Sequence, residues 1–307
     1  MSAEGGRGTA ARHAGSLEVR GLTLSIGGSE ILKGVDLSVP AGAITGLAGE
    51  SGSGKTMTGL AVCGLQPAGS RLGGSIEFRI DDEAPVDLLS LPPKSMNRLR
   101  GRRIAMIFQD PSASLHPMLS IGAQLTDHVR HHLGLSRAAA RERAIELLER
   151  VQVPDPASAL QRYPHQFSGG QLQRIAIAGA IACDPVVLIA DEPTTALDVT
   201  VQAGILRLLR QLCDDLGLAV VLVTHDLGVM SAVADTVAVM RTGEVVENGT
   251  RYQVIREPVT EYARELVASL PHVPPPGAGV VGDSGAPAGI PAGAPVDVRA
   301  HAPEEDL

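Results

Sequence analysis

The sequence predicts an α/β fold that carries an antiparallel β subdomain and an inserted α-helical subdomain. Apolar residues alternate near the N-terminus, which is typical of half-buried antiparallel strands. Short continuous apolar runs at 43–49, 186–190 and 218–223 are typical of parallel strands covered on both faces. Between 110 and 183 no strand-like run occurs, and this stretch predicts the helical insertion. The 307 residues are 44% hydrophobic, so a sizeable core is available.

The predicted folded domain spans residues 16–270, with the helical subdomain inserted at about 110–183. Residues 1–15 are small and polar, and we expect them to be disordered. Residues 271–307 are rich in Pro, Gly and Ala, and we expect a disordered tail there as well.

The first half of the domain begins with two predicted antiparallel strands. Apolar residues alternate from Leu17 to Ile26 and again from Val35 to Val39. The apolar strand at 43–49 then leads into a glycine-rich loop, after which a helix should begin near Lys55.

Further along the chain, the sequence predicts two helices and a hairpin. Residues 137–151 place Ala and Leu on one face of a helix and Arg and Glu on the other. Residues 201–217 are apolar at helical spacing, and Gly217 is a natural C-terminal stop. Residues 236–249 predict a hairpin that turns at Thr242 and Gly243.

Composition excludes several classes of protein. The net charge is −8 and aromatic residues make up only 2%, which argues against a general nucleic-acid binder. The cysteines, Cys63, Cys183 and Cys213, lack metal-ligand spacing, so we expect buried free thiols in a reducing compartment. No window approaches the roughly 20 apolar residues that span a bilayer, and the N-terminus lacks the apolar middle of a signal peptide. We therefore expect a cytosolic protein that meets a membrane only through a partner.

The glycine-rich loop "GESGSGKT" at 49–56 fits the phosphate-loop pattern G-x-x-x-x-G-K-[ST]. Glycines permit positive φ angles, so backbone N–H groups can point at phosphate oxygens, and the following helix N-terminus adds its dipole. Lys55 can reach the β- and γ-phosphates, and the Thr56 hydroxyl can ligate Mg²⁺. The predicted nucleotide-binding residues of this loop are Gly49, Glu50, Ser51, Gly52, Ser53, Gly54, Lys55 and Thr56.

Polar residues follow three predicted strands. Asp191 and Glu192 end the run "VVLIADE"; Asp191 there can hold Mg²⁺, and Glu192 can polarise an attacking water. His225 follows the strand at 218–223 and is predicted to contact the γ-phosphate. Gln109 follows the strand "RIAMIF", where a glutamine can contact Mg²⁺ or the lytic water. A surface amide is the alternative for Gln109, and spacing alone does not choose between them.

These pieces together resemble the nucleotide-binding subunit of an ABC transporter over roughly residues 17–270. Its motifs stand in the family's order: the phosphate loop, Gln109, "FSGGQ" at 167–171, "VVLIADE", "ALD" at 196–198 and His225. The sequence "FSGGQ" differs from the usual LSGGQ signature only in its first residue.

The resemblance implies a head-to-tail dimer with ATP and Mg²⁺ held between subunits. The signature residues Ser168, Gly169, Gly170 and Gln171 would then touch the γ-phosphate of the ATP on the opposite phosphate loop, and Asp198 would also lie at the nucleotide. A helix N-terminus at this turn would favour binding of an anion. The turn itself has no lysine, and in such a dimer the opposite subunit supplies one. Ser168 can also be a helix N-cap, and the two roles are compatible.

Three longer stretches of the sequence indicate which subclass of ABC ATPase the chain resembles. Residues 108–125, 162–174 and 190–206 look like the ATPase subunits of oligopeptide, dipeptide and nickel importers. The resemblance implies a second, paralogous ATPase subunit, two membrane permease subunits contacted by the segment after Gln109, and an extracytoplasmic substrate-binding protein. It also implies a peripheral position on the cytoplasmic face of the cell membrane. Peptides are the favoured transported substrate, and nickel or a metal chelate is the alternative.

A soluble, non-transport ABC ATPase acting on DNA or ribosomes is the less favoured class. Such proteins usually carry two motif sets or a coiled-coil insertion, whereas this acidic chain shows one set and no heptad run. Two departures from the family pattern also stand out. The neighbourhood of Ile26 has no aromatic residue to stack on adenine, and no cysteine follows Cys213, so an iron–sulfur cluster in the tail is excluded.

Overall fold

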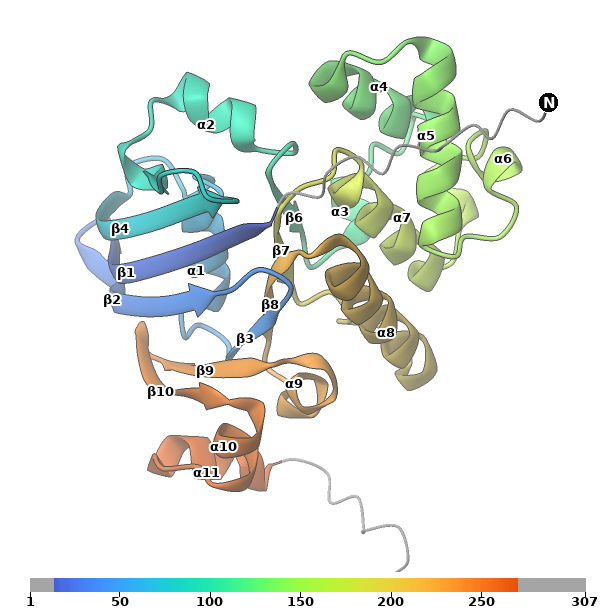
Figure 1. Ribbon diagram of the computed structural model, residues 1–307. Helices are drawn as coiled ribbons and strands as arrows, with labels where there is room; N and C mark the ends of the chain where they lie inside the picture. The colour runs from blue at the N-terminus through green and yellow to red at the C-terminus, as the bar shows by residue number, and fades with distance from the viewer. Residues whose placement is uncertain (1–13, 270–307) are drawn as a thin grey trace, which may run out of the picture. The chain divides into compact units, whose positions relative to one another are not determined.

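The computed structural model describes residues 14–269 (Figure 1). The expectations of disorder for the first residues of the chain and for 271–307 fall outside this range, except for Ala14 and Gly15. Gly15 already belongs to the first strand.

One sheet is antiparallel and has the order β2-β1-β4-β5 (Figure 1). Its strands are β1 (Gly15–Ile26), β2 (Ser29–Val39), β4 (Arg71–Ile80) and β5 (Val86–Asp87). The antiparallel pairing predicted for the first two strands is confirmed, with Leu17 opposite Val39. The sequence pattern does not predict β4. Gly74 breaks its apolar pattern at a φ of +87°, and a Cβ there would lie 2.4 Å from the Gly21 carbonyl oxygen, so this close approach requires glycine.

The second sheet has six strands in the order β10-β9-β3-β8-β7-β6. Its strands are β3 (Ile44–Ala48), β6 (Ile104–Ile107), β7 (Val187–Asp191), β8 (Ala219–Thr224), β9 (Thr236–Arg241) and β10 (Glu244–Thr250). All neighbours are parallel except β10, which forms with β9 the predicted hairpin around Thr242 and Gly243. Both turn residues have positive φ, as a tight hairpin of this twist requires.

The α-helices and the two 3₁₀ turns connect and cover these strands. The helices are α1 (Lys55–Val62), α2 (Pro93–Leu99), α3 (Pro111–Ser114), α4 (Ile121–Leu133), α5 (Arg137–Arg150), α6 (Pro156–Ala159), α7 (Gly169–Ile181), α8 (Val199–Leu216), α9 (Leu227–Val233), α10 (Arg251–Arg256) and α11 (Glu261–Ala268). The 3₁₀ turns are η1 (Leu88–Ser90) and η2 (Pro164–Gln166). Residues 111–181 contain helices and no strand, as the sequence indicates. Gly217 ends α8 at a φ of +67°, the left-handed conformation expected of a C-terminal glycine.

The parallel sheet separates two apolar cores, which explains why its strands are apolar throughout. Val220 and Leu222 of β8 belong to the core shared with α4, α5, α7 and α8. Val221 and Val223 of the same strand belong to the core shared with α1 and the antiparallel sheet. Alternate side chains therefore face opposite cores, as the period of two along a strand requires.

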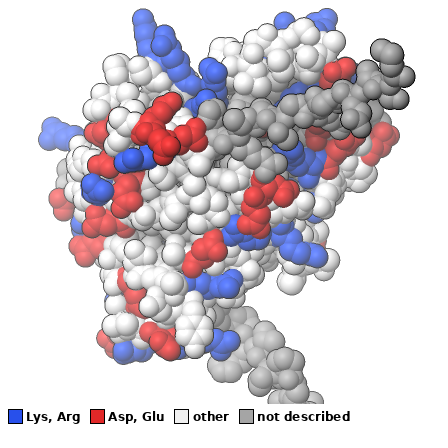
Figure 2. Space-filling view, in the orientation of Figure 1, with Lys and Arg blue, Asp and Glu red and all other residues white. Residues whose placement is uncertain are grey.

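The three cysteines are buried free thiols, which confirms that part of the prediction. Burial raises the pKa of Cys63 to about 12 and that of Cys183 and Cys213 to about 11. Acidic and basic side chains are interspersed on the face shown in Figure 2. Within residues 14–269, no helix is long and apolar enough to cross a bilayer.

Candidate active site

The predicted phosphate-loop and strand-end residues gather at one edge of the parallel sheet. Strands β3, β8, β7 and β6 run in the same direction, so their carboxyl ends lie at a common edge. The phosphate loop follows β3, His225 follows β8, Asp191 and Glu192 end β7, and Gln109 follows β6. These residues span positions 49–225 of the sequence, and the order of the strands brings them to the same sheet edge.

The phosphate loop adopts backbone angles that only glycine tolerates easily. Gly49, Gly52 and Gly54 have φ values of +147°, +82° and +107°. A Cβ at Gly49 would lie 2.2 Å from the carbonyl oxygen of Met240 at the end of β9, so the loop packs tightly on the neighbouring strand. Helix α1 begins at Lys55, which places a helix N-terminus directly behind the loop.

Lys55 lies inside the loop that it belongs to. Its side chain is buried, and Nζ donates to the carbonyl oxygens of Gly49 and Glu50, each at 2.8 Å. Burial lowers its pKa, and the nearby charges of Glu192 and Asp191 oppose that shift. The amine is therefore within reach of whatever the loop N–H groups bind.

Asp191 and Thr56 form a pair of neighbouring oxygen donors. The Thr56 hydroxyl donates to Asp191 Oδ1 at 3.1 Å, and Asp191 is only 4% exposed. Burial raises the pKa of Asp191; the charge of Glu192 adds to this shift, and the hydrogen bond from Thr56 opposes it. A hydroxyl and a carboxylate side by side are hard oxygen ligands of the kind Mg²⁺ prefers, so these residues fit that ion.

Glu192 is the centre of a hydrogen-bonded cluster that contains all three predicted catalytic residues. Its Oε1 lies 3.0 Å from His225 Nδ1, and its Oε2 accepts from Gln109 Nε2 at 3.3 Å. Thr195 also donates to Oε2, at 2.7 Å. Burial alone would raise the pKa of Glu192, but hydrogen bonds from His225 and Thr195 outweigh it and lower the pKa. The side chain is thus held as a carboxylate.

Gln109 and Thr195 both contact the Glu192 carboxylate. Gln109 lies against Glu192 and is not an isolated surface amide, which favours the site alternative. Thr195 was missed, although a hydroxyl three residues after a strand-end glutamate is a detectable signal. It occupies a turn in which its own N–H donates to the Glu192 carbonyl oxygen.

The predicted signature turn forms the start of α7. Ser168 accepts from the Gln171 N–H, and the Gln171 side chain accepts in return from the Ser168 N–H, so the two residues form a capping box. Phe167, the residue that departs from the usual motif, is buried beneath the Arg162 guanidinium, 4.0 Å from its ring centroid. The N-cap interpretation is therefore confirmed.

The signature turn packs against the start of α8. Asp198 caps α8 by accepting from the Val201 N–H at 3.0 Å, and a Cβ on Gly170 would lie 2.6 Å from Val201 Cγ1. Within residues 14–269, no hydrogen bond joins residues 168–171 or Asp198 to the phosphate loop. Hydrogen bonds thus link the strand-end residues to the loop, and none of those in residues 14–269 links the signature residues or Asp198 to it.

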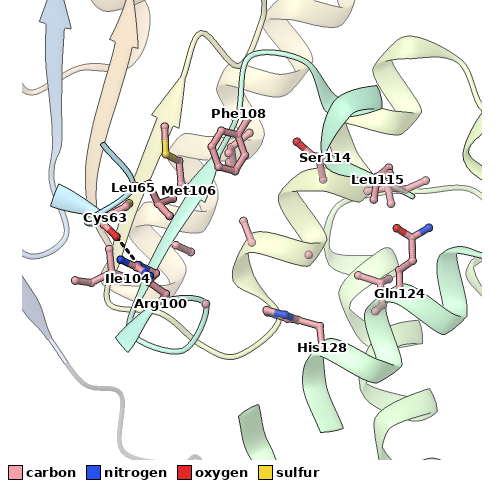
Figure 3. Close-up of a pocket in the computed structure, with 18 residues that line it drawn as sticks. Cys63, Leu65, Arg100, Ile104, Met106, Phe108, Ser114, Leu115, Gln124 and His128 are labelled. Atoms are coloured by element: carbon pink, nitrogen blue, oxygen red, sulfur yellow. Dashed lines mark hydrogen bonds between the residues drawn. The ribbon is translucent and has the colours of Figure 1, made fainter. Parts of the chain in front are cut away.

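A separate cavity of about 400 Å³ lies beside the segment that carries Gln109 (Figure 3). Its apolar wall includes Leu65, Met106 and Phe108, and its polar groups include Gln124 and His128. Arg100 lines it too, with its guanidinium bonded to the carbonyl oxygens of Cys63 and Gly64. None of the phosphate-loop residues lines this cavity, so it is a second feature, connected to the site through β6.

The phosphate loop, the strand-end carboxylates and the two sheets together define a P-loop nucleoside triphosphatase. The family model described as "ABC transporter" matches residues 32–195, more than half of the chain. The chain belongs to the ABC transporter family and is an ATP-binding ATPase of that type.

Curated relatives carry related descriptions. A putative peptide import ATP-binding protein of Brucella abortus (strain 2308) is 49% identical over 227 residues, which cover 74% of this chain and 67% of the relative. The oligopeptide transport ATP-binding protein OppD of Bacillus subtilis (strain 168) is 43% identical over 261 residues, 83% of this chain and 72% of the relative. The OppD of Salmonella typhimurium (strain LT2) is 41% identical over 274 residues, 88% and 80% respectively.

Solved structures confirm the cassette fold. A dimeric ATP-binding cassette in a post-hydrolysis state, bound to ADP and Pi, matches with a TM-score of 0.65 and 29% identity over 76% of this chain and 98% of that one. A part of an ABC transporter complex from Clostridium perfringens matches with a TM-score of 0.65 and 28% identity over 83% and 95%.

Proposed function

We propose that this ATPase powers the import of peptides through a membrane ABC transporter. The observation that carries the proposal is the meeting of the phosphate loop, Asp191 and the Glu192 cluster at one sheet edge, in a chain whose curated relatives are described as peptide import and oligopeptide transport ATP-binding proteins. Nickel or a metal chelate is the alternative substrate, and none of the relatives described above favours it.

The roles proposed at the site follow from its contacts. Lys55 and the loop N–H groups bind the β- and γ-phosphates of ATP. Glu192, ionised and aimed by Thr195 and His225, orients the attacking water and accepts its proton. His225 contacts the γ-phosphate. Gln109, which follows β6, contacts the attacking water or the Mg²⁺ ion.

Mg²⁺ is proposed to bind with the nucleotide, because Thr56 and Asp191 supply suitable oxygen atoms next to each other. Gln109 is a third candidate ligand through its amide oxygen, since its amide nitrogen donates to Glu192. The ion would neutralise phosphate charge when bound.

The proposed active unit is a head-to-tail dimer with a second, paralogous ATPase subunit. Residues 168–171 present a capped helix N-terminus with two glycines, a combination suited to an anion. They have no hydrogen bond to this chain's own phosphate loop, which supports a role for them, and for Asp198, at the partner's ATP.

Two membrane permease subunits and an extracytoplasmic substrate-binding protein complete the proposed transporter, with this chain peripheral on the cytoplasmic face. We place the permease contact at the cavity of Figure 3. Its wall includes Phe108, which directly precedes Gln109, so a segment seated there could move the residue that touches Glu192. Met118, in the segment that follows Gln109, is 77% exposed and apolar, as expected of a surface that a partner covers.

The proposal is tested on the complex purified from native membranes. Mass spectrometry identifies co-purifying chains, and ATP hydrolysis is then measured in proteoliposomes with a peptide mixture, with Ni²⁺ or with neither. The expected result is recovery of permease subunits and stimulation by peptides, with Glu192→Gln as the inactive control. Stimulation by Ni²⁺ alone would overturn the peptide assignment, and recovery without any membrane chain would overturn the transporter assignment.

A further inference from the structure

The last helix of the described chain touches the phosphate loop. Tyr262 of α11 is 7% exposed, and its hydroxyl oxygen accepts a hydrogen bond from the Glu50 N–H at 3.0 Å. The two residues are separated by 212 positions, and Glu50 is the second residue of the loop. A side chain outside every predicted motif therefore holds the backbone of the ATP-binding loop.

The position of the Tyr262 ring is itself fixed by the sheet. The Arg241 guanidinium lies over the ring, 4.8 Å from its centroid, and Arg241 is the last residue of β9. Strand β9 pairs with β3, which leads into the loop. The hydroxyl is thus held in place from the same sheet that carries the phosphate loop.

The backbone conformation of the phosphate loop is one that such a hydrogen bond can stabilise. Three glycines at positive φ make its bound shape costly in backbone entropy, because glycine has the most conformational freedom to lose. Outside contacts reduce that freedom at two points: the Gly243 N–H donates to the Ser53 carbonyl oxygen at 2.9 Å, and Tyr262 holds Glu50. The Gly49 carbonyl oxygen, which belongs to the same peptide group as the Glu50 N–H, accepts from Lys55, so Tyr262 and Lys55 hold the two sides of one peptide group.

We propose that Tyr262 is a positioning residue for ATP: its hydroxyl preorganises the first turn of the phosphate loop and thereby raises nucleotide affinity. This inference rests on the proposed binding of ATP phosphates by that loop. A loop that populates its binding shape only part of the time loses apparent affinity in proportion. Turnover at saturating ATP changes little, because Glu192 and its cluster do not depend on this hydrogen bond.

The test replaces Tyr262 with phenylalanine in the full-length protein. The substitution keeps the ring and its contact with Arg241 and removes only the hydroxyl. Tyr252→Phe on α10 is the matched control, because Tyr252 is 64% exposed. The measurements are ATP affinity by titration, KM and kcat for ATP hydrolysis, thermal melting without nucleotide, and hydrogen exchange at the Glu50 amide.

For Tyr262→Phe we expect ATP affinity to fall roughly threefold to tenfold, the effect of one neutral hydrogen bond. KM should rise to match, kcat should stay near the wild-type value, and the Glu50 amide should exchange faster. A purely structural role would lower the melting temperature and leave KM and the Glu50 amide unchanged, and that result would overturn the inference. A wild-type chain without ATP affinity would instead overturn the proposed function itself.

Discussion

Replacing Glu192 with glutamine removes the negative charge of the side chain at the proposed catalytic centre and keeps its size and shape. Glu192 accepts from His225 on one carboxylate oxygen and from Thr195 and Gln109 on the other. A glutamine that turns its carbonyl oxygen toward Thr195 and Gln109 keeps those two bonds, and its NH₂ can donate to His225 in the other ring tautomer. The free energy of unfolding should therefore change by less than about 1 kcal/mol.

The lost charge should act on the chemical step. A positioned general base typically contributes about 10²- to 10⁴-fold, so we expect kcat to fall by that factor. The negative charge of Glu192 also disfavours ionisation of Asp191 and repels incoming phosphates. ATP affinity should accordingly be kept or improved, and an ATP-bound dimer should accumulate.

Three assays check this expectation: phosphate release at saturating ATP, ATP titration, and light scattering with and without ATP. Glu244→Gln on β10 is the control, because Glu244 is exposed and outside the site. Phosphate release by Glu192→Gln at close to the wild-type rate would refute the assignment of Glu192, whatever the behaviour of the dimer.

Three further substitutions and the removal of Mg²⁺ test the remaining parts of the site. Lys55→Ala should weaken ATP binding by about 10- to 100-fold, because a charge-assisted contact to phosphate is lost; unchanged binding in a titration would contradict the phosphate-loop assignment. Gly170→Ala should lower the free energy of unfolding by about 1–3 kcal/mol through overpacking against Val201. Gly169→Ala should melt near the wild-type temperature, because its Cβ meets nothing nearer than 3.7 Å; equal melting of the two variants would refute this packing argument. Removal of Mg²⁺ by EDTA should abolish phosphate release and Mg²⁺ should restore it, whereas full activity in EDTA would exclude the proposed ion at Thr56 and Asp191.

The strand ends of the site could be predicted because their signals are local. The run "VVLIADE" shows a buried strand and the acids that end it, and the rule that carboxyl ends of parallel strands share an edge then places Asp191 near the phosphate loop. The hairpin at Thr242 and Gly243 was predicted for the same kind of reason, since its turn chemistry lies within a few residues.

Other contacts could not be predicted because they depend on tertiary packing. Nothing near Tyr262 in the sequence indicates that its hydroxyl meets Glu50, because that contact depends on where α11 packs relative to β3 and β9. Strand β4 was missed because its glycines interrupt the apolar pattern, although Gly74 is needed for a close approach to Gly21. The choice for Gln109 likewise depended on a contact with Glu192 across 83 positions.

The separation of the signature turn from the phosphate loop makes one final prediction about the proposed dimer. If a different ATPase chain is the partner, Lys55→Ala acts on the ATP that this chain holds, whereas Ser168→Ala acts on the ATP that the partner holds. Photocrosslinking of the assembled complex with azido-ATP below the affinity-saturating concentration distinguishes them: Lys55→Ala should strongly reduce labelling of this chain, and Ser168→Ala should leave it intact while slowing turnover. Loss of the Ser168 cap costs about 0.5–2 kcal/mol, so thermal melting must show that the variant is folded at the assay temperature. Loss of this chain's own label in a folded Ser168→Ala complex would refute the head-to-tail arrangement, because the signature turn would then serve the ATP of its own chain.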